Sequence, residues 1–116
     1  MTENRVIKVA FADASVQRAF IELKEGRFED RELAEWIQKS LEELRMDPFS
    51  GISIPRKLWP KYYVDKYGVD NLRKLDLPQG WRLIYFVRGN EVEIVSILLE
   101  WFDHADYNKR FGYKKN

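Results

Sequence analysis

The sequence predicts an α+β fold: an N-terminal strand, an antiparallel helical hairpin packed on an antiparallel sheet, a C-terminal three-strand meander and a short C-terminal helix. Two stretches rich in β-branched and aromatic residues, 81–87 and 92–101, are joined by a turn at Gly89-Asn90, which is typical of a hairpin. Before them, two segments carry apolar residues at helical spacing. These helices must cover one face of the sheet to bury their apolar stripes.

Composition sets the class of protein. The 116 residues, 45% hydrophobic and 15% aromatic, predict one globular domain over residues 1–116. There is no cysteine, which excludes disulfides and thiol chemistry and suits a reducing cytoplasm. No apolar run approaches the ~20 residues that span a membrane, and the N-terminus lacks an apolar signal core, so we expect a soluble cytoplasmic protein without membrane partners.

Charge is distributed unevenly along the chain. The net charge is only +1, but residues 1–50 hold 8 Lys/Arg against 11 Asp/Glu, whereas residues 51–116 hold 12 against 8. This asymmetry indicates that the second half meets a polyanion while the first is a solvated scaffold.

The first half reads as a strand and two helices. Residues 5–11 form the strand, Asp13 is the expected N-cap of the first helix, and Gly26 ends it. Asp30 is the expected cap of the second helix, which ends at Asp47-Pro48. Their short connection predicts an antiparallel helical hairpin.

The connector 49–70 is the least regular part of the chain. Pro60 can begin a short helix through Lys66, with Gly68 closing it. Cations and aromatic residues alternate here: Arg56, Lys57, Lys61 and Lys66 with Trp59, Tyr62, Tyr63 and Tyr67. Such interleaving suits single-stranded nucleic acid, and the alternative is that the rings pack the connector onto the sheet.

The last third reads as three strands and a helix. Residues 71–77, 81–87 and 91–101 are the strands, 78–80 is a turn, and 103–111 is the terminal helix. Alternation puts Trp81, Leu83, Tyr85 and Val87 on the face that the helices cover, and Arg82, Ile84, Phe86 and Arg88 on the other, partly open face.

Three of these segments carry a family pattern. They are the strand 71–77, the run Gly80-Trp81-Arg82-Leu83-Ile84-Tyr85, and the ending His104-Ala105-Asp106-Tyr107. Together with the element order they resemble the RelE/ParE superfamily of toxin-antitoxin toxins. The resemblance covers residues 5–48 and 71–111, and the connector is longer than in short family members.

Resemblance to the RelE side implies a metal-independent endoribonuclease that cuts messenger RNA on the ribosome, is held inactive by an antitoxin protein and needs no cofactor. His104 and Tyr107 favour this side. Resemblance to the ParE side implies a gyrase inhibitor instead. A third hypothesis is a binding module that keeps the fold without activity.

The resemblance implies four catalytic residues. In the family the strand arginine, Arg82 here, holds the scissile phosphate, which suits a planar, bidentate cation; the alternative is an ion pair with Asp76 or Glu100. Lys74 would aid proton transfer or stabilise charge, although Asp76 stands where the family has a second basic residue. His104, the only histidine, is a candidate general acid or base, or else a helix cap. Tyr107 would stack on a base or act as a base, or else pack the last helix on the sheet.

Further cations are candidates for positioning RNA by its phosphates, with solubility as their alternative role. They are Lys57, Lys61, Arg73, Arg88, Lys109 and Arg110, and the basic tail at 114–115 joins them. One histidine without cysteine makes a structural zinc site improbable, and there is no glycine-rich phosphate loop.

Overall fold

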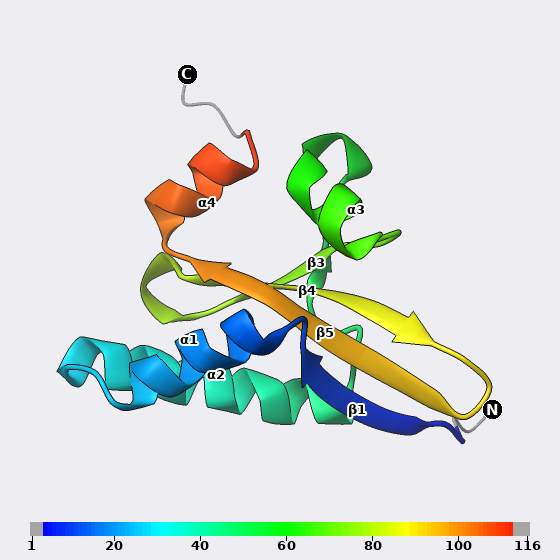
Figure 1. The fold of residues 1–116 in the computed structure, drawn as a ribbon, viewed down its shortest axis with the longest axis horizontal. Coiled ribbons are helices and arrows are strands. Elements are labelled where there is room, and N and C mark those ends of the chain that lie inside the picture. The colour runs from blue at the N-terminus through cyan, green and yellow to red at the C-terminus, as the bar shows by residue number, and fades with distance from the viewer. Residues whose placement is uncertain (1–3, 113–116) are drawn as a thin grey trace.

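The computed structural model describes residues 4–112, which form an α+β fold on one five-stranded sheet (Figure 1). The sheet is open and mixed, in the order β1-β5-β4-β3-β2. The elements are β1 (Val6–Phe11), α1 (Ala14–Lys24), α2 (Phe28–Met46), β2 (Ile52–Ser53), the 3-10 turn η1 (Arg56–Leu58), α3 (Lys61–Tyr67), β3 (Arg73–Asp76), the 3-10 turn η2 (Pro78–Gly80), β4 (Arg82–Gly89), β5 (Glu93–Phe102) and α4 (His104–Arg110). Within the described residues, no helix has the length and apolar character needed to cross a membrane.

The prediction of a wholly antiparallel sheet is wrong at one edge. The meander β3-β4-β5 is antiparallel as expected, but β1 pairs with β5 in parallel, with Val6 opposite Glu93 and Phe11 opposite Leu98. Parallel neighbours need a long connection, and here the helical hairpin, the connector and two strands supply it. The connector also adds the short strand β2, which pairs with β3.

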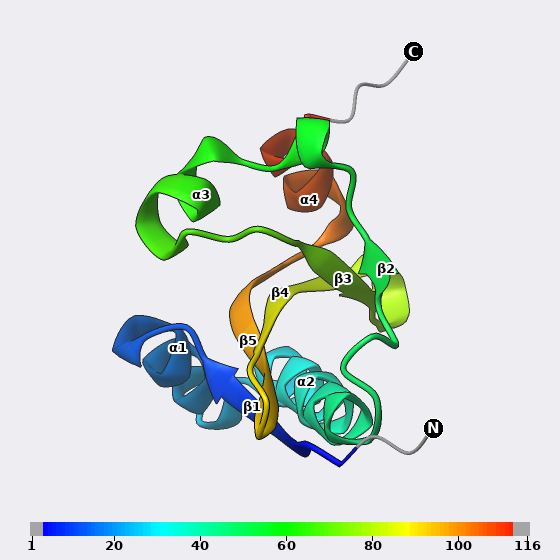
Figure 2. The same cartoon turned by 90° about the vertical axis from the view of Figure 1, so that its right-hand side faces the viewer.

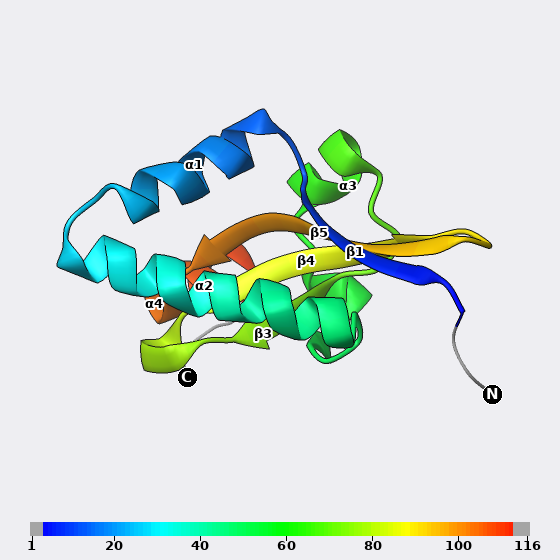
Figure 3. The same ribbon diagram turned by 90° about the horizontal axis from the view of Figure 1, so that it is seen from below.

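The helical hairpin covers one face of the sheet, as the sequence predicts (Figure 3). Asp13 caps α1 by accepting from the backbone N–H groups of Ser15 and Val16 at 3.0 and 3.1 Å. Helix α2 begins earlier than predicted, with Arg27 as its N-cap, and Asp30 lies in its first turn, where it accepts from Arg27 N at 3.2 Å. The core below the sheet contains Phe20, Leu33, Ala34, Ile37, Leu41, Leu44, Leu75, Leu77, Leu83, Tyr85 and Leu98.

The other face of the sheet is covered too, which differs from the partly open face that alternation predicts. Helices α3 and α4 lie over it, so the sheet stands between two helical layers (Figure 2). Tyr63 of α3 is fully buried, and its ring centroid lies 6.2 Å from that of Phe111 after α4. A second core forms here from Ile54, Tyr63, Val69, Leu72, Ile84, Phe86, Leu99, Phe102, Tyr107 and Phe111. Part of the connector's aromatic content therefore builds this core.

A β-bulge in β5 turns one carboxylate toward this second core. Tyr85 pairs with Leu98 but Ile84 pairs with Glu100, so Leu99 is the extra residue. Without the bulge, Glu100 would lie on the face covered by the hairpin. On the second face it accepts a 2.6 Å hydrogen bond from the Tyr63 hydroxyl. Burial raises the pKa of Tyr63, and the hydrogen bond to Glu100 raises it further.

Candidate functional site

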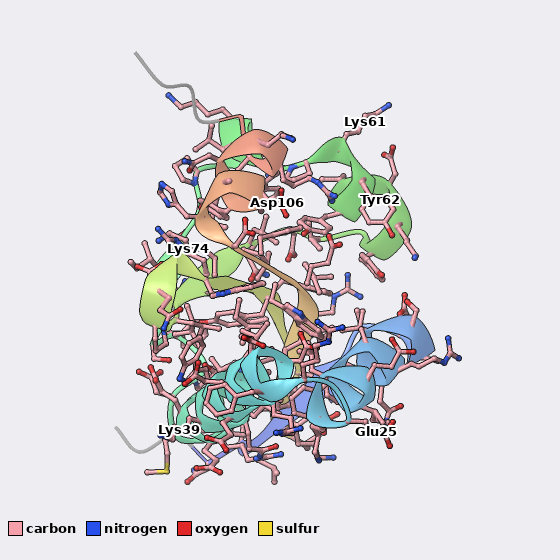
Figure 4. The ribbon with its side chains drawn as sticks, turned by 90° about the vertical axis from the view of Figure 1, so that its left-hand side faces the viewer. Glu25, Lys39, Lys61, Tyr62, Lys74 and Asp106 are labelled. Carbon is pink, nitrogen blue, oxygen red and sulfur yellow. The ribbon has the colours of Figure 1, made fainter. Side chains whose placement is uncertain are left out.

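Lys74 and Arg82 project from adjacent strands into one pocket on the second face. Arg82 pairs with Asp76 and Lys74 with Ile84 in the β3-β4 ladder, so period-two alternation puts both cations on the same side. The pocket has a volume of about 240 Å³ and is lined by Lys74, Arg82, Tyr107 and Asn108. Figure 4 shows Lys74 between the sheet and α4.

Arg82 is held by contacts of its guanidinium with Gly80 and Asp76. Its Nη1 donates to Gly80 O at 2.7 Å, and its Nε lies 3.0 Å from Asp76 Oδ1. The Nε contact has ion-pair distance without hydrogen-bond geometry. Its side chain is 18% exposed. Within residues 4–112 its Nη2 has no hydrogen-bond partner, so this donor is available to an anion in the pocket.

Asp76 is shared by both cations of the pocket. Its Oδ1 lies 2.7 Å from Lys74 Nζ and 3.0 Å from Arg82 Nε. The expected alternative for Arg82, an ion pair across the sheet, is therefore present with Asp76, whereas Glu100 bonds to Tyr63 and Arg110. Two cations against one carboxylate leave a local charge of +1. Because Asp76 is half exposed, an incoming anion can reach the same two cations.

Tyr107 forms the wall of the pocket. The residue is 3% exposed and its ring stacks on Phe111, with centroids 4.6 Å apart and planes at 27°. Lys74 Nζ and Arg82 Cζ lie 5.9 and 5.5 Å from the ring centroid, within cation–π range. The ring thus packs α4 onto the sheet, as in the structural alternative, while it also meets both cations.

His104 is exposed at the start of α4, next to the pocket. Asp103 is the N-cap, because its carboxylate accepts from a backbone N–H of the first turn, so His104 does not cap the helix. Its Nε2 lies 3.3 Å from Asn108 Nδ2, one turn along α4. It also packs against η2, since a Cβ built on Gly80 would lie 3.1 Å from His104 Cβ. His104 and Arg82 therefore both adjoin Gly80.

Arg73 and Arg88, both predicted to bind RNA, make structural contacts to the connector. Arg73 Nη2 donates to Gly51 O at 2.8 Å. Arg88 Nη2 donates to the carbonyls of Tyr67 and Gly68 at 2.9 and 3.0 Å, at the C-terminal end of α3. A cation at the C-terminal end of a helix satisfies the terminal carbonyls and interacts favourably with the partial negative charge of the helix dipole there.

The remaining predicted RNA-binding cations lie on η1, α3 and α4. Lys57 and Lys61 belong to the connector, and Lys109 and Arg110 end α4. Arg110 Nη1 lies 3.3 Å from the Glu100 carboxylate. The tail cations at 114–115 lie outside the described residues.

Helix α3 is tied to α1 through Asp13. Tyr67 donates its hydroxyl proton to Asp13 Oδ2 at 2.7 Å, and Lys66 Nζ lies 3.4 Å from the same oxygen. The hydrogen bond from Ser15 is the main reason that the pKa of Asp13 lies well below its usual range, and the hydrogen bond from Tyr67 lowers it further. Burial and the bond to Asp13 raise the pKa of Tyr67 to about 12. The polar tie fixes α3 relative to the first helix.

Sequence reasoning missed one lining residue of the pocket, Asn108. The spacing of four residues from His104 was the available signal, because residues i and i+4 meet on a helix. Among residues 4–112, no three His, Asp or Glu side chains gather as a metal site requires.

Comparison of the chain with protein-family models, curated proteins and solved structures finds no match. The role of the pocket must therefore be inferred from its chemistry: two cations, an aromatic wall, an amide and a neighbouring imidazole.

Proposed function

We propose that this protein is the toxin of a toxin-antitoxin pair, a metal-independent endoribonuclease that cuts messenger RNA on the ribosome and so stops translation. The observation that carries the proposal is the convergence of Lys74 and Arg82 on one pocket beside Tyr107. The sequence resemblance to RelE-like toxins assigns phosphate chemistry to these same positions.

Metal-free cleavage of RNA uses the 2′-hydroxyl as nucleophile. A base takes the 2′-hydroxyl proton, O2′ bonds to phosphorus, and the bond from phosphorus to O5′ breaks as an acid protonates O5′. The products are a 2′,3′-cyclic phosphate and a 5′-hydroxyl. Arg82 and Lys74 would stabilise the charge on the phosphoryl oxygens, the task that fixed cations in a partly desolvated site perform best.

His104 supplies the proton-transfer group in this proposal. Its exposure leaves the ring accessible to substrate, and an imidazole can both accept and donate a proton. Tyr107 presents its face to the two cations and packs α4 beside them, so its role here is to shape the pocket.

The proposal includes a protein partner, a cognate antitoxin that keeps the enzyme inactive. The sequence resemblance to RelE-like toxins supports this partner. A gene for a short acidic protein next to the gene for this chain would support it.

One observation favours a second candidate, a binding module without catalysis. Asp76 partly neutralises both pocket cations, because its Oδ1 lies 2.7 Å from Lys74 Nζ and 3.0 Å from Arg82 Nε. A protein of this kind would bind RNA and leave it intact.

Purified ribosomes programmed with a defined messenger RNA, followed by primer extension, test the proposal. We expect new 5′ ends with the wild-type protein and none with Arg82→Ala. The matched control is Lys39→Ala, because this exposed lysine lies on α2, on the opposite side of the sheet from the pocket (Figure 4).

Intact messenger RNA with the folded wild-type protein would refute the enzyme. Full cleavage by Arg82→Ala would refute the role proposed for Arg82. Bound but intact RNA would identify the binding module. Growth arrest with DNA damage and intact messenger RNA would point to the gyrase inhibitor.

A further inference from the structure

The layer that covers the second face of the sheet is strongly basic. We call η1, α3 and α4 the basic cap; α3 and α4 lie on the same side of the sheet in Figures 1 and 2. Its cations are Arg56, Lys57, Lys61, Lys66, Lys109 and Arg110, and its acids are Asp65 and Asp106. On the opposite layer, α2 has six acidic residues against three basic ones. A polyanion is therefore attracted to the cap and repelled by α2.

Three of these cations have no ion-pair partner in the described part of the chain. They are Arg56, Lys57 and Lys109. Lys61 has only a 3.8 Å contact with Asp65 and its side chain is 89% exposed, so solvent screens that pair. A ligand phosphate can therefore bind these cations without first breaking a strong ion pair with a protein carboxylate.

Tyr62 gives the cap an exposed aromatic surface. The residue is 48% exposed, although its neighbour Tyr63 is fully buried. Lys66 Nζ lies 3.0 Å from the Tyr62 hydroxyl, and the edge of Tyr67 meets the Tyr62 ring at 87° with centroids 6.3 Å apart. These contacts hold the ring in place, so stacking a base on it costs little conformational entropy.

We propose that the basic cap binds single-stranded RNA, with a base stacked on Tyr62 and phosphates bound by Lys57 and Lys61. This inference rests on the proposed function for its choice of polymer, and it extends that function to nucleotides that flank the scissile one. Helix α4 joins the two regions, because it lines the pocket with Tyr107 and Asn108 and carries Lys109 in the cap. Cations interleaved with an aromatic ring bind single strands with little sequence preference.

The test uses RNA that cannot be cut. A fluorescent 2′-O-methyl oligonucleotide of about 12 nucleotides covers the site size of a single-strand binding surface and lacks the nucleophilic hydroxyl. We expect Tyr62→Ala to weaken binding, measured by anisotropy, at least about fivefold, the lower end for loss of one stacked base. The matched control is Phe28→Ala: Phe28 is 66% exposed and lies on α2, so binding stays unchanged.

The phosphate contacts are tested by salt dependence. For Lys57→Ala with Lys61→Ala, we expect the slope of log affinity against log salt to fall by about 1.4, or about 0.7 per lost contact with a single strand. Lys39→Ala leaves the slope unchanged, because Lys39 lies away from the cap (Figure 4). Circular dichroism checks that each variant is folded.

Equal RNA affinity for Tyr62→Ala and Phe28→Ala overturns the inference. So does preferential binding of polyglutamate over RNA, which would make the cap a surface for an acidic protein. Because the oligonucleotide cannot be cleaved, failure of the ribonuclease proposal does not affect this result. Conversely, the wild type could cleave messenger RNA while the cap variants bind the oligonucleotide as tightly as the wild type does. That result would refute RNA binding by the basic cap and leave the ribonuclease proposal standing.

Discussion

Asp76 and Arg82 stand opposite each other on β3 and β4, and Asp76 Oδ1 lies 3.0 Å from Arg82 Nε. The same oxygen lies 2.7 Å from Lys74 Nζ. In the proposed enzyme this carboxylate competes with substrate phosphate for both cations. In that proposal, the strength of the competition sets how readily the pocket would bind RNA.

Asp76→Asn removes the competing charge. We expect the affinity for the 2′-O-methyl oligonucleotide to rise roughly two- to fivefold, in line with the ≤ ~1 kcal/mol of a half-exposed ion pair. Anisotropy titration measures it, and Glu42→Gln, an exposed acid on α2, is the control. Unchanged or weaker binding would show that Asp76 positions the cations instead of competing for them.

Asp13→Asn keeps a good N-cap but removes the charge that Tyr67 and Lys66 contact. The pKa of native Asp13 is depressed, so its ionised form stabilises the fold above the unfolded value of about 3.9. We expect the wild type to have a higher free energy of unfolding than Asp13→Asn, and this difference should be largest at neutral pH. It should shrink as the pH falls below about 4 toward the native pKa.

Urea unfolding of both proteins over that range measures this difference. A difference that stays constant as the pH falls would show that the Asp13 charge does not stabilise the native state.

Tyr85→Phe tests the buried anchor of the connector. The Tyr85 hydroxyl donates to Pro48 O at 2.9 Å and accepts from Gly51 N at 3.1 Å. Removing it leaves two buried backbone groups without this partner, so we expect the free energy of unfolding to fall by about 1–3 kcal/mol. Tyr62→Phe is the control, because that hydroxyl is on the surface. Equal urea midpoints for the two variants would contradict the prediction.

Arg88→Ala tests what holds the C-terminal end of α3. Loss of the bonds to the carbonyls of Tyr67 and Gly68 should let the last turn open, where Gly68 N donates to Val64 O. We expect faster hydrogen exchange at residues 64–68 with little change elsewhere, and no such change in the exposed control Arg18→Ala. Uniformly faster exchange would mean that Arg88 supports the whole fold instead.

Local sequence patterns predicted several elements of this structure. Helical spacing and the Asp13 cap predicted α1, and Gly68, with φ 61°, ends α3 where the sequence placed it. Strict alternation put Leu83 and Tyr85 against the helical hairpin. Such features depend on residues within a few positions of one another, so the sequence by itself determined them.

Other features were decided only by the tertiary structure. The parallel pairing of β1 with β5 and the bulge that turns Glu100 toward Tyr63 depend on segments far apart in the chain. So does the meeting of Lys74 and Arg82 with Tyr107, since only the packing of α4 brings that ring to the strands. From the sequence, Lys74, Arg82 and Tyr107 could be proposed as separate candidates. That Lys74 and Arg82 share one carboxylate is seen only in the pairing of β3 with β4. Local propensity carries no information about such long-range contacts, because they are chosen by the burial of whole faces.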